Sequence, residues 1–344
     1  MNIRPPQQQN DRKISRSKVE SRPKGFALVL VLWILSLLTI MAGSFALTMR
    51  RESTIVAGIK DNAGAVAAAE AGIAVAEMML LHPEQNKHWR TDGNIYQVDF
   101  GNTQIRLRLL SEAGKIDINK ADPPLLLGLI AQVPVEEDLQ AKLIGAILDW
   151  RDKDDLLNIE GAEKKEYRDA GLKYHPRNKP FQTVEELQMV LGMDGRVFNW
   201  LEPLITVYSG QAQVNLKLAS ANVLNIVPGL DASLIASFVA ARLESGKNGL
   251  PAPEFPASLV RGGASANETV TIVSEARMVD ETSALVTATV AKLDATQSVA
   301  FDGIPSVPFK VLKWQRNPAN EKSLFTDEMS EFLVKQYAEP ELSD

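Results

Sequence analysis

The chain has no cysteine and only three histidines among its 344 residues. The lack of cysteine excludes disulfides, thiolate metal ligands and cysteine nucleophiles. The histidines, His82, His88 and His175, occur in no HExxH motif and beside no GxSxG motif. We find no catalytic constellation and therefore expect the chain not to be an enzyme.

Basic residues are scarce relative to acidic ones beyond the N-terminus. The formal net charge is −6, and residues 1–49 contribute 7 − 2 = +5, so the remainder carries 30 − 41 = −11. Binding to nucleic acid needs a positive face that can neutralise phosphates. The acidic remainder argues against nucleic acid as a partner.

What the chain does have is one long apolar run. Residues 26–49 carry no charged side chain; as a helix they would measure about 36 Å, which exceeds the roughly 30 Å hydrocarbon core of a bilayer. The basic residues before the run favour a cytoplasmic N-terminus. The apolar core of a secretory signal peptide has roughly 7–15 residues. The run at residues 26–49 is longer, which argues against a secretory signal peptide.

Gly25 immediately precedes this run. Cleavage after Gly25 would remove a basic leader, residues 1–25, and leave Phe26 as the new N-terminus with the apolar helix attached. An ordinary single-pass anchor without cleavage is the alternative. Alanine is abundant from Ala57 to Ala76, and Pro83 follows. Because alanine is the best helix former and proline ends helices, we expect a helix over residues 26–82, ending near Leu81.

Alternating polar and apolar residues predict strands in the second part of the chain. A hairpin is indicated by residues 96–100 and 104–110 around Gly101-Asn102. Runs rich in valine and threonine follow at 269–273, 284–290 and 309–314. The expected antiparallel sheet draws on residues 94–116, 203–211 and 268–315 and packs on the long helix.

An internal repeat lies between these strands. Residues 116–126 align with residues 214–224, and Asp122 and Ser220 fall where helix N-caps are expected. A third helix is expected after Thr183, whose spacing to Glu186 suits a capping box. We expect an inserted α-helical domain over 117–202 and a second helix-hairpin-helix-like repeat over 212–250. In DNA-binding hairpins a glycine stands where this chain has Asp231, so the motif is interpreted as a packing unit.

The C-terminal residues 317–344 form an acidic tail. Residues 325–337 have apolar spacing compatible with one amphipathic helix. The tail either packs on a partner or is a mostly disordered extension, and the sequence leaves both open.

Several segments together resemble the minor pseudopilin K family of type II secretion systems. They are residues 22–27, the alanine-rich helix, residues 114–121, 149–155, 161–163, 174–181 and 184–187, the repeat near Pro228-Gly229, and residues 308–314. The resemblance covers roughly residues 20–316. It implies an α+β fold, in which a pilin-like long N-terminal helix packs on an antiparallel sheet. It further implies a large inserted α-helical domain that contains helix-hairpin-helix (SAM-like) repeats.

The resemblance also implies a function and partners. Family members sit at the tip of the pseudopilus and initiate or cap its assembly for export of folded proteins across the outer membrane. The implied partners are the minor pseudopilins I and J, through them H and the major pseudopilin G, and prepilin peptidase, which cleaves after Gly25 before Phe26 is N-methylated. The implied location is the inner membrane, single-pass, with a periplasmic C-terminal domain.

Two other functions stay open from the sequence. One is a minor pilin of a type IV pilus system, against which the helical insert argues. The other is a membrane-anchored protein for DNA binding and uptake, against which Asp231 and the acidic charge argue. Position five counted from Phe26 is Leu30, where most pilins have a glutamate that is thought to pair with a neighbouring subunit's N-terminal amine. A subunit without that carboxylate suits a unique end position.

Acidic residues crowd the stretch from Asp149 to Glu163. Calcium takes six to eight oxygen ligands, often from such loops, and the resemblance implies calcium binding. We therefore consider a Ca²⁺ site at Asp152, Asp155 and Glu163, although Lys164 and Lys165 would repel the ion. The alternative is a solvated helix end in which Asp149 pairs with Arg151 or Lys153.

Overall fold

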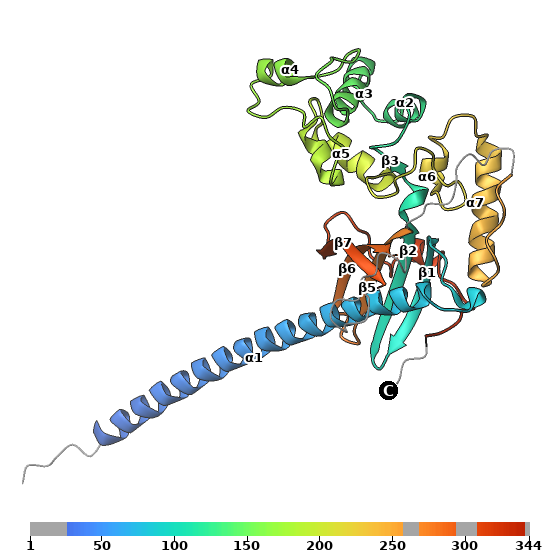
Figure 1. The fold of residues 1–344 in the computed structure, drawn as a ribbon. Coiled ribbons are helices and arrows are strands. Elements are labelled where there is room, and N and C mark those ends of the chain that lie inside the picture. Colours follow the sequence, from blue (N-terminus) through green and yellow to red (C-terminus); the bar gives the residue numbers. More distant parts are fainter. Residues whose placement is uncertain (1–25, 257–267, 294–307, 341–344) are drawn as a thin grey trace, which may run out of the picture. The chain divides into compact units, whose positions relative to one another are not determined.

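The computed structural model describes residues 26–256, 268–293 and 308–340 (Figure 1). The chain divides into two compact units, one that ends at Ile59 and one that begins at Lys60.

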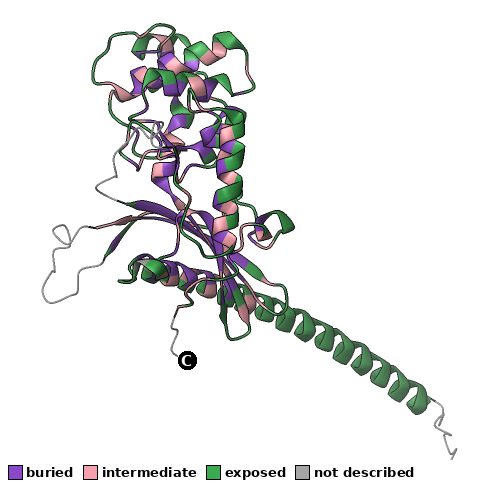
Figure 2. Ribbon diagram, turned by 90° about the vertical axis from the view of Figure 1, so that its right-hand side faces the viewer, coloured by how far each residue is buried: buried purple, intermediate pink, exposed green. Residues whose placement is uncertain are grey.

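The first unit is the N-terminal part of helix α1, which as a whole spans Phe26–Leu80. All residues from Phe26 to Ile59 are exposed, as the green ribbon in Figure 2 shows. The predicted helix from Phe26 to the region of Leu81 is thus confirmed. Of the described helices, α1 is long and apolar enough to cross a membrane.

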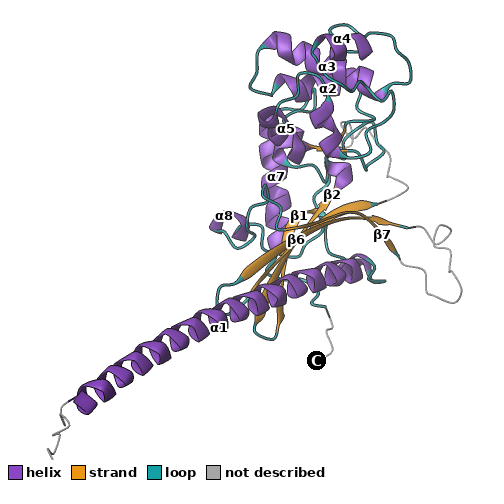
Figure 3. Ribbon diagram, turned by 90° about the vertical axis from the view of Figure 1, so that its left-hand side faces the viewer, coloured by secondary structure: helices purple, strands orange, loops and turns teal. Residues whose placement is uncertain are grey.

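The second unit contains a five-stranded antiparallel sheet (Figure 3). Its strand order is β1-β2-β5-β6-β7, and the strands are β1 (Asp92–Phe100), β2 (Thr103–Ser111), β5 (Thr269–Arg277), β6 (Ser283–Lys292) and β7 (Phe309–Arg316). The predicted hairpin around Gly101-Asn102 and the three predicted late strands are confirmed.

The C-terminal part of α1 packs on one face of this sheet. Ala69, Ile73 and Ala76 are buried there against the aliphatic side chains of β2, β5 and β6. Gly72 permits the closest approach, since a Cβ at that position would lie 2.9 Å from Cγ2 of Ile105 and even nearer to Oγ of Ser274. The apolar alternation along the strands therefore supplies the surface that receives the helix.

The helical region is inserted between β2 and β5, which are hydrogen-bonded neighbours from Ser111↔Val270 to Gln104↔Arg277. The intervening elements are η2 (Glu112–Gly114), β3 (Ile116–Asp117), α2 (Pro123–Ala131), α3 (Glu137–Arg151), α4 (Lys164–Asp169), η3 (Val184–Met189), α5 (Gly195–Leu201), η4 (Glu202–Leu204), β4 (Ile205–Thr206), α6 (Ala221–Leu224) and α7 (Ala232–Lys247). Strand β4 pairs in parallel with β3, so residues 203–211 contribute to a separate two-stranded sheet rather than to the antiparallel sheet.

The inserted elements have a hydrophobic core of their own. It contains residues of both repeats, including Leu126 and Leu143 from the first and Leu224 and Ile235 from the second. Trp150 is fully buried in it and stacks on Phe181 with a centroid distance of 6.0 Å. The two repeats therefore share one core.

The predicted N-caps of the repeats are confirmed. The Asp122 carboxylate accepts a hydrogen bond from Leu125 N at 3.0 Å, and Ser220 Oγ accepts one from Val223 N at 3.3 Å. Asp231 caps α7 by accepting hydrogen bonds from Ser233 N and Leu234 N. An acidic N-cap is favourable because it satisfies free amides at the positive end of the helix.

The expected capping box at Thr183 is wrong. The side chain of Thr183 makes no cap hydrogen bond, and a 3₁₀ helix, η3, follows it. Glu186 instead accepts a hydrogen bond from Gln182 N at 2.8 Å and pairs with Arg177. A nearby arginine therefore holds the carboxylate that the capping box would have used.

The acidic tail packs on its own chain rather than forming the long helix or the disordered extension considered above. Over residues 317–340, the part that the structure describes, it forms one short helix, α8 (Asp327–Ser330), and then runs beside β1. Ile95 N donates to Phe332 O and Val334 N donates to Ile95 O, both at 2.9 Å. Within the described part of the chain, the tail thus covers the β1 edge of the sheet.

Candidate functional site

The predicted acidic cluster lies in the loop between α3 and α4. Asp149, on the last turn of α3, is fully buried. Its Oδ1 atom accepts hydrogen bonds from the backbone N and the side-chain Nδ2 of Asn158, at 3.1 and 2.5 Å. Arg151 donates instead to the carbonyls of Ile118 and Ala121. Asp149 is therefore part of the loop's internal structure and not of a solvated helix end.

Four oxygen atoms in this region are buried and have no hydrogen-bond donor. They belong to three carboxylates and one amide: Asp149 Oδ2, Asp152 Oδ1, Glu163 Oε1 and Asn178 Oδ1. Buried polar atoms normally have a partner because leaving one without any is costly. A bound cation is one way to satisfy oxygen atoms that only accept.

Further contacts connect Asp149 with Asp152 and place Asn178 beside Asp155. Nδ2 of Asn158 reaches Oδ2 of Asp152 at 3.3 Å as well as Asp149. Asn178, on the far side, donates through Nδ2 to Oδ1 of Asp155 at 2.8 Å. The two asparagine amides thus link three acidic residues around one loop.

The carboxylates of the cluster repel one another. Burial raises the pKa of Glu163 to about 7, and repulsion from Asp149, Asp152 and Asp155 acts in the same direction. The pKa of Asp152 is raised by burial and by the charges of Asp154 and Asp149. A divalent cation would relieve this repulsion.

The three predicted ligands differ in whether their carboxylate oxygens already have a hydrogen-bond donor. Asp152 and Glu163 each have an oxygen without a donor, whereas Asp155 has a carboxylate oxygen engaged by Asn178. Asn178 was not anticipated as a ligand. The side chains do not form a finished site, because no three Asp, Glu or His residues of the described ranges already surround a common point. The oxygen donors fit a hard cation such as Ca²⁺, provided that the side chains close around it.

Of the two predicted processing residues, the structure describes one. Phe26 is the first residue of α1, and Gly25 lies outside the described residues. Leu30 is half exposed on the apolar helix, and every residue around it from Phe26 to Met49 is exposed. This long exposed apolar surface is what a membrane anchor requires.

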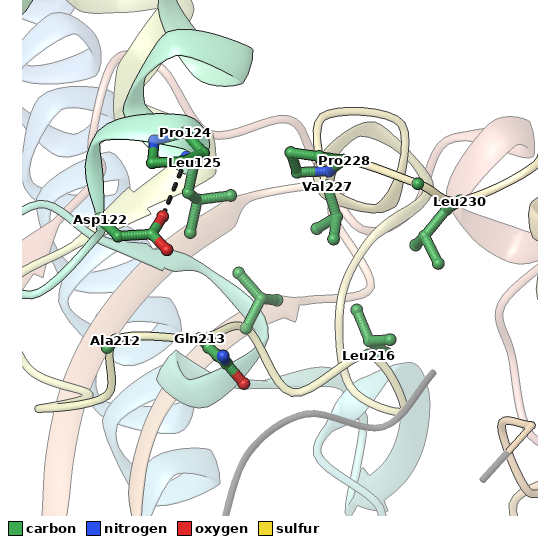
Figure 4. Close-up of a pocket in the computed structure, with 11 residues that line it drawn as sticks. Asp122, Pro124, Leu125, Ala212, Gln213, Leu216, Val227, Pro228 and Leu230 are labelled. Atoms are coloured by element: carbon green, nitrogen blue, oxygen red, sulfur yellow. Dashed lines mark hydrogen bonds between the residues drawn. The ribbon is translucent and has the colours of Figure 1, made fainter. Parts of the chain in front are cut away.

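A hollow of about 300 Å³ lies between the two repeats (Figure 4). Its walls are the start of α2, the segment 212–216 and the loop 227–230. Asp122 is the single ionisable side chain among the described residues that line it, and this carboxylate is used to cap α2. The hollow therefore offers no acid–base pair for catalysis.

Comparisons with known proteins agree with this architecture. Residues 105–210 match the family described as "Type II secretion system (T2SS), protein K". The type II secretion system protein K of Aeromonas hydrophila is 28% identical over 212 residues, which are 54% of this chain and 63% of that protein. The protein of the same name from Klebsiella pneumoniae is 25% identical over 215 residues, 57% of this chain and 66% of that protein. The matched regions thus span less than two thirds of these relatives.

A solved structure supports the fold independently of sequence. A chain in the crystal structure of the GspK-GspI-GspJ complex from the enterotoxigenic Escherichia coli type 2 secretion system matches with a TM-score of 0.50 and 18% identity. The match covers 75% of this chain and 96% of that chain. The family match and the two relatives confirm the resemblance predicted from the sequence, and the solved structure agrees in fold: the chain is similar to the type II secretion system protein K.

Proposed function

We propose that this protein is a minor pseudopilin at the tip of a type II secretion pseudopilus, where it initiates or caps assembly for the export of folded proteins across the outer membrane. The observation that carries the proposal is the insertion. A helical region interrupts an antiparallel sheet between two paired strands, β2 and β5, and the sheet packs on a long N-terminal helix. The similarity to protein K over residues 105–210 supports the same function.

The exposed apolar part of α1 would be the stem. In this proposal prepilin peptidase cleaves after Gly25, Phe26 becomes the methylated N-terminus, and the helix anchors the chain in the inner membrane with its remaining part in the periplasm. Leu30 cannot form the ion pair that a glutamate there would offer to a neighbouring amine. This absence suits a subunit that begins or ends a stack.

The inserted helical region would prevent further subunits from being added beyond this one. Residues 117–202 and 212–250 add a second hydrophobic core to the pilin-like sheet. A subunit that carries so much additional volume would block another subunit from stacking beyond it. The minor pseudopilins I and J are the proposed direct partners, with H and the major pseudopilin G reached through them.

The mass of the N-terminal peptide of the mature protein tests the class. We expect a peptide that begins at methylated Phe26. Co-purification of the full chain with the I and J subunits of the same cell, together with loss of export in cells that lack the gene, tests the role. An intact leader in the assembled protein, or normal export without the gene, would overturn the proposal.

We further propose that the loop between α3 and α4 binds Ca²⁺ through Asp149, Asp152 and Glu163, with Asn178 as an additional oxygen donor. The four buried oxygens without donors support this site, and so does the unfavourable negative charge around Glu163. The ion would neutralise the carboxylates and fix the loop, and it would take no part in any reaction.

A further inference from the structure

A hollow of about 420 Å³ in the inserted helical region has walls rich in side-chain amides. It shares no residue with the hollow of Figure 4, and its volume lies within the roughly 300–1,000 Å³ of small-molecule sites. Its walls include one tryptophan and four carboxamides: Trp200, Gln132, Asn199, Asn222 and Asn225. No described residue that lines this amide hollow is ionisable.

The four carboxamides of the amide hollow can reach a ligand. All four residues are exposed, and within the described part of the chain their side chains make no hydrogen bond. Each carboxamide presents a donor and an acceptor side by side, and a hydroxyl group likewise both donates and accepts. Four such groups around one hollow therefore suit a ligand that carries several hydroxyl or amide groups.

Trp200 gives the amide hollow an aromatic wall. Its side chain packs against the buried helical core and is only partly buried, so the remaining part lines the hollow. The face of an aromatic ring is negative, and it attracts the weakly positive C–H groups on the face of a sugar ring. An aromatic ring surrounded by uncharged amides thus matches both parts of a saccharide, its C–H face and its hydroxyl groups.

The walls of the amide hollow are fixed before any ligand arrives. Helix α2, which ends beside Gln132, packs closely on the segment after α6, because a Cβ at Gly128 would lie 2.7 Å from the carbonyl oxygen of Ile226. Helix α5, another wall, is capped by Asp194, which accepts a hydrogen bond from Val197 N at 2.8 Å. A site on rigid elements loses little freedom when it binds.

The charged side chains of the elements that form these walls are engaged elsewhere. Arg196 of α5 pairs with Asp194 at 3.1 Å. Glu202 of η4 accepts a hydrogen bond from Asn320 at 2.9 Å and lines a different hollow. Helices α2 and α6 and the segments 132–135 and 225–230 contain no charged residue. A phosphate or carboxylate ligand would need Lys or Arg in the wall, so the hollow favours a neutral ligand.

Two other classes of neutral ligand fit this hollow less well. An apolar ligand would remove water from the four amides without replacing their hydrogen bonds. An extended peptide typically binds by adding a strand to a sheet edge, and no described strand residue lines the amide hollow.

We propose that the amide hollow binds a neutral saccharide. The C–H face of a sugar ring would lie on Trp200, and its hydroxyl or acetamido groups would pair with Gln132, Asn199, Asn222 and Asn225. The inference goes beyond the proposed role in export and does not depend on it, because it concerns a ligand that the purified chain binds alone.

Nuclear magnetic resonance of the full chain, labelled with ¹⁵N in its tryptophans, tests this site. The chain is purified in a detergent without a sugar head group, and its five tryptophans give indole N–H signals, of which Trp200→Phe identifies one. Glucose, galactose, mannose, N-acetylglucosamine, maltose, cellobiose and chitobiose are the probes. We expect at least one of them to shift the Trp200 signal in a saturable way and to leave the signals of Trp89 and Trp150 in place.

Substitutions then test the contribution of the amides. Asn222→Ala with Asn225→Ala should lower the association constant about tenfold or more, because two hydrogen bonds to the sugar are lost. Gln132→Ala, at the opposite wall, should lower it as well. The matched control is Gln188→Ala, at an exposed carboxamide of η3 that does not line the hollow, and this variant should bind like the unmodified chain. An unchanged thermal unfolding midpoint shows that each variant is folded.

Several results would overturn the inference. They are a Trp200 signal that no saccharide moves, an association constant that is the same in the variants and the unmodified chain, or a larger shift with uncharged trialanine than with any sugar. Co-sedimentation with insoluble cell-wall glycan distinguishes a polymeric source of the saccharide from a free sugar, and either source agrees with the site. Loss of binding without loss of export would leave the proposed function intact.

Discussion

Asn158 donates two hydrogen bonds to a single carboxylate oxygen of Asp149, one from its backbone and one from its side chain. The other oxygen of Asp149 is buried and receives none. A carboxylate that is held so firmly on one side and left unsatisfied on the other is oriented for an additional positive group. This relationship underlies the proposed Ca²⁺ site.

Addition of Ca²⁺ should raise the thermal unfolding midpoint of the full chain in detergent micelles. When the free Ca²⁺ concentration is about 100 times the Kd, binding to the folded state alone adds about 2.7 kcal/mol to the free energy of unfolding. For a chain of this size, that gain raises the unfolding midpoint by roughly 5 °C. Asp149→Asn and Glu163→Gln should each weaken this response, since each removes one negative oxygen ligand.

The matched control for the calcium site is Asp169→Asn, on the exposed end of α4, where the carboxylate pairs with Lys165 at 2.8 Å. This variant should retain the full response to Ca²⁺. A midpoint that does not move when Ca²⁺ is added to the unmodified chain would reject the site.

The elements that could be predicted from the sequence are those whose pattern is local. The apolar run after Gly25 predicts α1, and the alternation around Gly101-Asn102 predicts the hairpin of β1 and β2. The N-caps Asp122 and Ser220 were also predictable, because capping involves residues only three positions away. In each case the residues that determine the structure are neighbours in the sequence.

The fold of the tail could not be predicted from its apolar spacing, because its apolar residues make contacts with residues that are distant in the sequence. The ring of Phe325 contacts two guanidinium groups, with Arg106 at 4.5 Å and Arg277 at 4.2 Å from the ring centroid. Leu333 pairs with Ile95 on β1. Leu324 and Ser330 both accept hydrogen bonds from Arg106, which lies more than 200 residues earlier in the sequence. The spacing of apolar residues within the tail cannot indicate such distant partners.

The candidate site was predictable only in part for the same reason. Asp152 and Glu163 belong to one visibly acidic stretch, whereas Asn178 comes from the segment before Phe181. Its positive φ of 53° and its hydrogen bond to Asp155 become visible only in the structure. The asparagine in the predicted motif at residues 174–181 was the one signal that could have indicated it.

Glu112→Gln should destabilise the second unit at neutral pH by about 2 kcal/mol, the contribution typical of a buried hydrogen bond to a charged group. Glu112 is buried, pairs with Lys115 at 2.8 Å and accepts a hydrogen bond from Thr271 at 2.7 Å. Burial alone would raise the pKa of this carboxyl, but Lys115 and the hydrogen bonds outweigh burial and lower it.

The sign of this pH dependence follows from the lowered pKa. The folded state holds the proton of Glu112 less tightly than the unfolded state, so the stabilisation is complete above the unfolded value of 4.5 and is lost as the pH falls through the lower folded value. Thermal unfolding from pH 7 to pH 3 should therefore show the two proteins converging in acid. Glu281→Gln, whose side chain is 79% exposed, is the control, and a constant difference across this range would contradict the assignment.

Gly72→Ala should loosen the packing of α1 on the sheet. The added Cβ would meet Ser274 and Ile105, and overpacking of this kind costs about 1–3 kcal/mol. At Gly64 on the same helix, the nearest atom to an added Cβ is the flexible end of Met278 at 3.6 Å. Gly64→Ala should thus be neutral or stabilising by up to about 1 kcal/mol, because alanine favours helix. Circular dichroism melts of both variants distinguish the effects, and equal midpoints would contradict the close approach at Gly72.

Removal of residues 321–344 should make the protein prone to association. The tail supplies both backbone partners of Ile95 and covers a small cluster in which Ile95, Val273 and Leu324 are buried. Its loss would expose the backbone of β1 as an unpaired sheet edge, which is a template for pairing with other chains. Light scattering of the full chain and of the truncated chain, at equal concentration in the same detergent, measures the effect.

Two further variants separate the edge from the apolar cluster beneath the tail. Leu324→Ala keeps the backbone pairing of Ile95 but creates a cavity, so it should lower the free energy of unfolding by about 3 kcal/mol without increasing association. Removal of residues 341–344 alone keeps every tail contact described above and should change neither property. If the long truncation stayed monomeric and melted at the same temperature as the full chain, the tail would not be what protects the β1 edge.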